Sequence, residues 1–252
     1  MGRLDGDMTS FNIGRGGFAF TGARFDKLAA TATDFTLVTI AVDVSTSVGP
    51  FKNDLINMLK TSVDACKKNP RSENILVRVI LFSARFDKGV SEIHGFKPLA
   101  DINLDDYNSI KTGGWTPLID ACYSAVGATN KYAEEMRKQD FGSNAIFFDI
   151  TDGDENASVA TMEMLKNECK KALQSEALES LISILIGVNS DQYDAQRRAT
   201  WRSLRNSFRN LFRASRRRSA PVVRASTSPQ RYKKRHSTKG GASPPFLLIG
   251  RY

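Results

Sequence analysis

Apolar residues in this chain fall into two alternating patterns. Continuous runs rich in β-branched residues are typical of strands buried on both faces of a parallel sheet, and apolar positions that recur every three or four residues are typical of helices with one buried face. This alternation predicts a doubly wound, Rossmann-like α/β fold with a mostly parallel sheet. Strands are predicted over 37–42, 75–82, 89–96 (at the sheet edge), 144–150 and 181–186, and helices over 51–63, 117–126, 157–177 (capped by Ser158) and 191–212.

Oxygen-bearing side chains follow two of the predicted strands. Asp43, Ser45 and Ser47 come directly after the first strand, and in an extended turn alternate side chains project to the same side. Asp152 follows the strand that begins at residue 144 in the same way. Ligands of open α/β sheets bind at the carboxyl ends of the strands. We therefore expect two carboxylates and two hydroxyls to meet at one edge of the sheet.

This set of side chains favours a divalent cation. Two carboxylates brought close together repel each other unless a cation lies between them, and a hydroxyl-rich shell suits Mg²⁺ or Mn²⁺. No His or Cys accompanies them, which argues against zinc. Gly113 and Gly114 let the backbone approach a ligand closely, and Thr116 adds a hydroxyl at the start of a helix. Each motif alone also occurs as an ordinary turn or helix start, so the prediction rests on their combination.

Three segments carry a resemblance to a known family: Val-Asp-Val-Ser-Thr-Ser at 42–47, Gly-Gly-Trp-Thr-Pro-Leu-Ile-Asp-Ala at 113–121 and Ile-Thr-Asp-Gly at 150–153. In this order they resemble the metal-ion-dependent adhesion site of von Willebrand factor A domains, and the predicted elements resemble that family over roughly residues 35–212. Members with such Thr-Pro-Leu and Thr-Asp-Gly segments are frequent in bacterial and phage proteins and are typically intracellular.

The resemblance implies a role for each matching residue. Ser45 and Ser47 would coordinate the cation directly, Thr116 directly or through water, and Asp43 and Asp152 mainly through bridging waters. An Asp or Glu of a protein partner would then complete the octahedron. Two positions depart from the family pattern: Thr46 stands where many members have Gly, and the bulky Trp115 lies beside the expected metal.

The net charge of +9 averages two different parts of the chain. Residues 1–196 contain 20 Lys and Arg and all 27 Asp and Glu, whereas residues 197–252 contain 16 Lys and Arg and no acidic residue. The second part is also dominated by Arg. Two explanations account for this change: a basic arm that binds nucleic acid through its phosphates, or a reading-frame shift in the gene.

The start of the basic part has the pattern of an amphipathic helix. Trp201, Leu204 and Phe208 recur at helical spacing opposite a row of arginines. We expect this stripe to pack on the sheet as the last helix of the domain, the alternative being a helix that lies on a membrane surface. Residues 213–252 are expected to be a disordered basic tail, and residues 1–34 an extension with little structure, so the predicted domain covers 35–212.

Other signals exclude some classes of function. His94 and His236 are the only histidines, so a Ser-His-Asp hydrolase has little to build from. His94 falls on the predicted edge strand, where we expect it to be exposed. No phosphate-binding glycine motif, secretory segment or apolar stretch of ~20 residues is present. The three cysteines lack metal-type spacing and indicate the cytoplasm.

We therefore expect a protein-binding module without catalytic residues. It would use a Mg²⁺ or Mn²⁺ site and would not bind a membrane. The alternative is a nucleic-acid-associated protein that acts through its Arg-rich tail. A weaker third hypothesis is a metal-assisted phosphohydrolase, for which Asp154 or Glu155 is the only adjacent general base.

Overall fold

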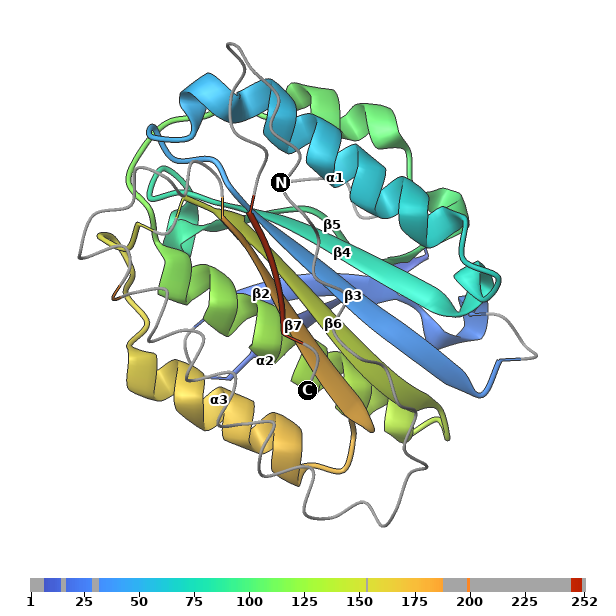
Figure 1. The fold of residues 1–252 in the computed structure, drawn as a ribbon. Coiled ribbons are helices and arrows are strands. Elements are labelled where there is room, and N and C mark those ends of the chain that lie inside the picture. The colour runs from blue at the N-terminus through green and yellow to red at the C-terminus, as the bar shows by residue number, and fades with distance from the viewer. Residues whose placement is uncertain are drawn as a thin grey trace, which may run out of the picture.

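The computed structural model in Figure 1 describes residues 7–14, 17–28, 32–152, 154–187, 199 and 246–250. Helix α1 covers one face of a central sheet, and helices α2 and α3 cover the other. No helix in these ranges is both long and apolar enough to span a membrane. The strands are β1 (Met8–Ile13), β2 (Phe18–Ala23), β3 (Asp34–Asp43), β4 (Ile75–Phe82), β5 (Val90–Pro98), β6 (Gly142–Thr151), β7 (Ser180–Gly187) and β8 (Phe246–Gly250), and the helices are α1 (Lys52–Lys67), α2 (Leu118–Arg137) and α3 (Met162–Gln174).

The sheet has the strand order β1-β2-β5-β4-β3-β6-β7-β8 over the described residues. Strands β4, β3, β6 and β7 are parallel neighbours, whereas β5 and β8 are antiparallel to β4 and β7. The predicted doubly wound and mostly parallel α/β fold is therefore confirmed. In the register of β3 and β6, Val42 lies opposite Ile150, so the two strands end side by side. Their carboxyl ends consequently share one edge of the sheet.

Both faces of the central strands are buried, as the continuous apolar runs predict. Val38, Ile40 and Val42 of β3 pack against Leu55 and Leu59 of α1 on one face. The residues between them face the other layer, where α2 and α3 contribute a second core. Burial on both faces fixes the register of these strands, and therefore the position at which each strand ends.

The N-terminal segment is not the unstructured extension that we predicted. Strands β1 and β2 form a hairpin that continues the sheet beyond β5, so β5 is an inner strand. Phe20 is 2% exposed, and the hydroxyl of Tyr132 donates to the carbonyl of Ala23 over 2.7 Å. The alternation in Phe-Ala-Phe-Thr-Gly-Ala is a strand signal, but it is short and interrupted by small residues.

The new position of β5 also changes the environment of His94. We predicted an exposed edge histidine, whereas His94 is half-buried and its Nε2 lies 2.8 Å from the Tyr107 hydroxyl. Burial lowers the pKa of His94, because the interior disfavours the charged imidazolium.

The prediction of disorder over 213–252 is wrong for five of these residues. Phe246–Gly250 forms β8, which pairs with β7 from Gly187 to Ser183. Phe-Leu-Leu-Ile is a continuous apolar run, and it pairs with the backbone groups that β7 would otherwise leave open at the sheet edge. The rest of the predicted tail lies outside the described residues.

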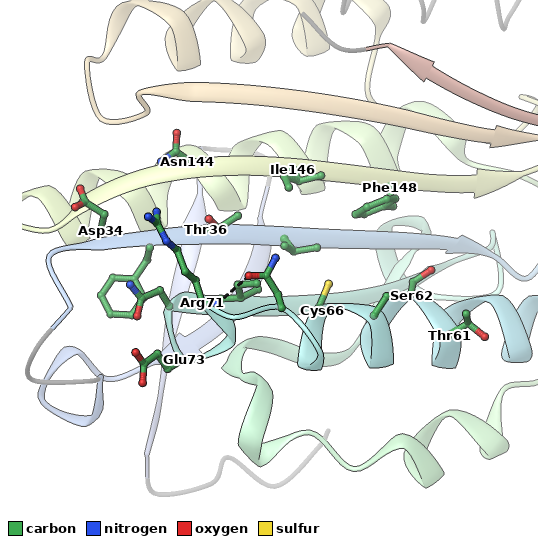
Figure 2. Close-up of a pocket in the computed structure, with 16 residues that line it drawn as sticks. Asp34, Thr36, Thr61, Ser62, Cys66, Arg71, Glu73, Asn144, Ile146 and Phe148 are labelled. Carbon is green, nitrogen blue, oxygen red and sulfur yellow. Dashed lines mark hydrogen bonds between the residues drawn. The ribbon is translucent and has the colours of Figure 1, made fainter. Parts of the chain in front are cut away.

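A groove of about 810 Å³ runs along α1 at the amino ends of β3 and β6 (Figure 2). Ile146 and Phe148 of β6 and Cys66 of α1 line it, together with polar groups that include Asp34 and Arg71. It begins at the opposite end of the strands from Asp43, and it is therefore separate from the predicted metal site. The predicted helix over 191–212, expected to pack on the sheet, falls outside the described ranges except for Ala199, which is helical.

One charged residue lies inside the otherwise apolar strand β4. Arg78 is fully buried, and its Nε donates to the Glu92 carboxylate of β5 over 2.7 Å. Its Nη2 donates to the Ser124 hydroxyl of α2 over 3.2 Å, and its guanidinium lies over the ring of Phe20. Thr21 of β2 donates to the second oxygen of Glu92. The pair therefore connects the N-terminal hairpin, the sheet and α2.

We predict that Glu92→Gln lowers the free energy of unfolding by roughly 3–5 kcal/mol, because it leaves the Arg78 charge buried without a counter-ion. Denaturant unfolding measures the effect. Glu135→Gln is the matched control, because Glu135 pairs with Lys131 over 2.6 Å at the surface. That change should cost less than about 1 kcal/mol. Equal losses in the two variants would contradict the prediction.

Candidate metal centre

Asp43 lies at the carboxyl end of β3 and is completely buried. One carboxylate oxygen accepts the backbone N–H of Ser45 over 2.8 Å, and the other accepts the hydroxyl of Thr151 over 2.7 Å. Burial raises the pKa of Asp43 to about 6; the bonds from Ser45 and Thr151 oppose this shift, and the charge of Asp152 adds to it. The two hydrogen bonds thus hold the carboxylate in one orientation, and its burial favours neutralisation of its charge.

Ser45 and Ser47 lie on the turn that follows β3. Their hydroxyl oxygens are 3.1 Å apart, with Ser45 buried and Ser47 exposed. The bond from Ser45 N–H to Asp43 fixes the start of the turn, and the backbone N–H of Thr46 donates to the Gly114 carbonyl over 2.9 Å. The predicted alternation therefore places both hydroxyls beside Asp43, with the 113–116 segment bonded to the same turn.

The glycines before Thr116 have a steric reason. Gly114 has a φ of +85°, and a Cβ atom there would lie 2.6 Å from the hydroxyl oxygen of Ser83. The Gly113 N–H donates to the Val44 carbonyl over 2.8 Å, and the Ala84 N–H donates to the Trp115 carbonyl over 2.9 Å. A larger residue at 114 would push this segment away from β3 and β4. Glycine thus allows the loop to approach the strand ends.

Thr116 is bonded to the loop that begins at Asp152. Its backbone N–H donates to the Asn156 side-chain carbonyl over 2.8 Å, and its carbonyl accepts the Asn156 N–H over 3.1 Å. Thr116 and Asp152 are each 2% exposed, and Asp152 accepts the N–H of Asp154 over 3.2 Å. Asn156 therefore ties two of the predicted ligand-bearing segments together.

The same loop caps the N-terminus of α2. The N–H of Ile119 donates to Glu155 over 2.8 Å and to the Ser158 hydroxyl over 3.0 Å, and the Asp120 carboxylate accepts the N–H groups of Val159 and Ala160. We predicted Ser158 as the cap of the following helix, whereas Thr161 caps α3 and Ser158 caps α2. These bonds cross the tertiary structure and cannot be anticipated from neighbouring residues.

The capping bonds also bear on the phosphohydrolase hypothesis. Both carboxylate oxygens of Glu155 accept hydrogen bonds, from Ile119 and from the N–H and hydroxyl of Ser158. A carboxylate committed to a helix N-terminus is poorly placed to take a proton from a water at the strand ends. Glu155 is therefore a structural residue in this arrangement.

The donor set has the chemistry of a Mg²⁺ or Mn²⁺ site. It offers two carboxylates and three hydroxyls, all of them hard oxygen donors. Among the described residues, no group of three or more His, Cys, Asp or Glu side chains lies close enough together to hold a metal. Mg²⁺ is commonly bound through only one or two carboxylates while it keeps several waters, so two carboxylates suffice. The residues present fit this ion and do not fit zinc.

The structure places all five predicted ligands, Asp43, Ser45, Ser47, Thr116 and Asp152, on segments at one edge of the sheet. Gly153 lies outside the described residues. Sequence reasoning missed Asn156, Asp120 and the orienting role of Thr151. Only Thr151 had a signal, because it precedes Asp152 at the end of a strand.

No protein-family model matches the chain, and no curated protein matches it. Similar solved structures include the open conformation of the pilus adhesin SpaC from Lactobacillus rhamnosus GG, which is 11% identical to this chain. The match covers 79% of this chain and 31% of SpaC, with a TM-score of 0.49. Proximal thread matrix protein 1 from the mussel byssus is 19% identical, and the match covers 63% of this chain and 39% of that protein, with a TM-score of 0.46. Manganese-loaded TRAP from Plasmodium vivax is 14% identical, and the match covers 67% of this chain and 63% of TRAP, with a TM-score of 0.40.

The chain thus spans 31% to 63% of the length of these three proteins. Likenesses this distant carry no argument about function, so the function is inferred from the residues of this chain itself.

Strand β6 carries a further buried carboxyl group, three residues before Asp152. Asp149 of β6 is 1% exposed, and neither of its carboxyl oxygens has a hydrogen-bond partner within the described structure. Burial raises its pKa to about 7. The thiols of Cys122 on α2 and Cys169 on α3 lie close enough to interact with it electrostatically. Ionised Asp149 would be a buried charge, so the folded protein favours its neutral form.

This shift predicts how stability depends on pH. Between pH of about 4 and 7 the folded protein would retain a proton on Asp149 that the unfolded chain has released, so the contribution of Asp149 to stability falls as pH rises, by about 1.4 kcal/mol for each pH unit. Asp149→Asn should therefore unfold at higher denaturant concentration than wild type at pH 7.5, and the gain should shrink at pH 4.5. The exposed Asp54→Asn variant is the control. A gain that does not change with pH would contradict the prediction.

Proposed function

We propose that this protein is a metal-dependent protein-binding module. Asp43, Ser45, Ser47, Thr116 and Asp152 would hold Mg²⁺ or Mn²⁺, and an Asp or Glu side chain of a partner protein would complete the coordination shell. The proposal rests on one observation above all. Two buried carboxylates and three hydroxyls lie on three interlocked segments at the carboxyl ends of β3 and β6.

The electrostatics of these groups support a cation. The charge of Asp152 acts on the carboxylate of Asp43, and both side chains are almost without solvent contact. Burial of two like charges is costly, and a divalent ion between them would offset both the desolvation and the repulsion. When bound, the ion would supply a positive charge that attracts an incoming carboxylate.

The hydroxyl donors suit binding better than catalysis. With the serine hydroxyls as direct ligands and the two carboxylates acting mainly through bridging waters, the ion would keep an open position for a protein carboxylate, whose contact would then require the metal. Hydrogen bonds engage Asp43 and both adjacent candidates for a general base, Asp154 and Glu155. We therefore propose that the protein acts by binding and is not an enzyme.

We predict that Asp43→Ala and Ser45→Ala each weaken Mn²⁺ binding by roughly 10- to 100-fold or more, because each removes an oxygen from the ligand shell. Calorimetric titration of Mn²⁺ measures the affinity, and circular dichroism checks the fold. Glu73→Gln is the matched control, because the Glu73 carboxylate is exposed and directly precedes the amino end of β4, at the opposite edge of the sheet. Unchanged affinity in both alanine variants would refute the site.

A second candidate function rests on the segregation of charge. Residues 197–252 contain 16 Lys and Arg and no acidic residue, which favours binding to the phosphates of nucleic acid. This part of the chain lies outside the described residues except for Ala199 and β8. The two functions do not exclude each other, since they would use different parts of the molecule.

Neutralising part of the tail tests this candidate without removing β8. We predict that glutamine substitutions weaken binding to duplex DNA and flatten its salt dependence, by a slope of ~0.9 for each phosphate that the protein no longer neutralises. Fluorescence anisotropy at several salt concentrations measures both. Binding that persists unaltered would place the DNA-binding surface elsewhere. The residues to be replaced are Arg216, Arg217, Arg218, Lys233, Lys234 and Arg235.

A further inference from the structure

Trp115 is exposed, although it belongs to a tightly bonded loop. Its side chain is 68% exposed and immediately precedes Thr116. Its carbonyl accepts the N–H of Ala84 over 2.9 Å, and the N–H of Thr116 donates to Asn156 over 2.8 Å. The backbone is thus fixed on both sides of the indole by two other segments. The exposure of the ring follows from the folded arrangement of the loop.

A second exposed apolar side chain lies close to the same segment. Within the described ranges the exposed large apolar residues are Trp115, Val159 and Met164, and Val159 is 80% exposed. Val159 belongs to the loop of Asn156, and its N–H donates to the Asp120 carboxylate near the start of α2. Two of the three exposed apolar side chains are therefore on the loops that meet at Thr116.

We infer that Trp115 determines which partner sequences bind; this inference rests on the metal-dependent binding proposed above. The partner's metal-bound Asp or Glu has an apolar side chain next to it in sequence, and this side chain packs on the indole. Tryptophan offers a large apolar surface with few rotamers, and rigid aromatic residues of this kind dominate binding at protein interfaces. Because the loop is already ordered, little conformational entropy is lost when the partner binds.

Neighbouring charges favour an apolar partner residue over a cationic one. Arg85 follows Ala84, which bonds the Trp115 carbonyl, and its guanidinium donates to the carbonyl of Lys111. Arg85 and Lys111 are both exposed. A Lys or Arg of the partner that stacked on the indole would add a positive charge beside the segments that carry Arg85 and Lys111. The acidic group that binds the metal is attracted by the same charges.

Calorimetric titration with two synthetic peptides tests this inference. Both are capped five-residue peptides with a central Glu; in one it lies between Leu residues, in the other between Gly residues. Each is titrated at millimolar concentration into the full chain in Mg²⁺ and in EDTA. We expect both to bind only in Mg²⁺, with the Leu peptide about fivefold tighter or more because it buries additional apolar surface. Trp115→Ala should abolish this preference, and Trp115→Phe should retain part of it.

The outcomes separate this inference from the function on which it rests. Mn²⁺ affinity of Trp115→Ala should equal that of wild type, which shows that the metal site is intact. Peptide binding that requires Mg²⁺ but shows no preference for Leu, or a preference that survives Trp115→Ala, would overturn the role of Trp115 and leave the metal-dependent function standing. Mn²⁺ binding without any Mg²⁺-dependent peptide binding would overturn both.

Discussion

The structure is organised around two parallel strands that end at the same level. Strands β3 and β6 are paired along their whole length, and this pairing brings the carboxylates of Asp43 and Asp152 into one buried region. Burying two like charges opposes folding. The apolar cores on both faces of the sheet must offset this cost, because they hold the strands in register. Every loop of the candidate site is then bonded to these strand ends or to another loop that is.

The strands and helices of the central domain were predictable because their patterns are local. The β-branched runs of β3, β4 and β7 and the helical spacing of α1 and α2 can be read from a few consecutive residues. The N-terminal hairpin was not predictable from the sequence, because its apolar residues are interspersed with Gly and polar residues. They become buried only against Phe96 and Tyr132. The interaction of Arg78 with Glu92 was not predictable either. Nothing in the sequence near Arg78 indicates that its counter-ion lies on the next strand.

The place of the candidate ligands in the fold was predictable for a different reason. Asp43 and Asp152 follow predicted strands, and the carboxyl ends of parallel strands meet at one edge of the sheet, where ligands of α/β sheets bind. The residues that hold the site in place could not. Asn156 bonds a backbone 40 residues away, and Ser158 caps a helix 39 residues earlier in the chain. Such bonds depend on the folded arrangement of loops that have no periodic pattern of their own.

The N-terminal hairpin has a consequence for the order in which the protein is made. Strand β2 leaves the ribosome before β5, with which it pairs, and Ala23 bonds Tyr132, which lies 109 residues later in the chain. At typical rates of synthesis the hairpin waits roughly 5–20 s for this partner. Its apolar face is uncovered during that time, while the central strands are still being added. This edge of the sheet is therefore completed only after β5 and α2 have been synthesised, although its own two strands precede them in the chain.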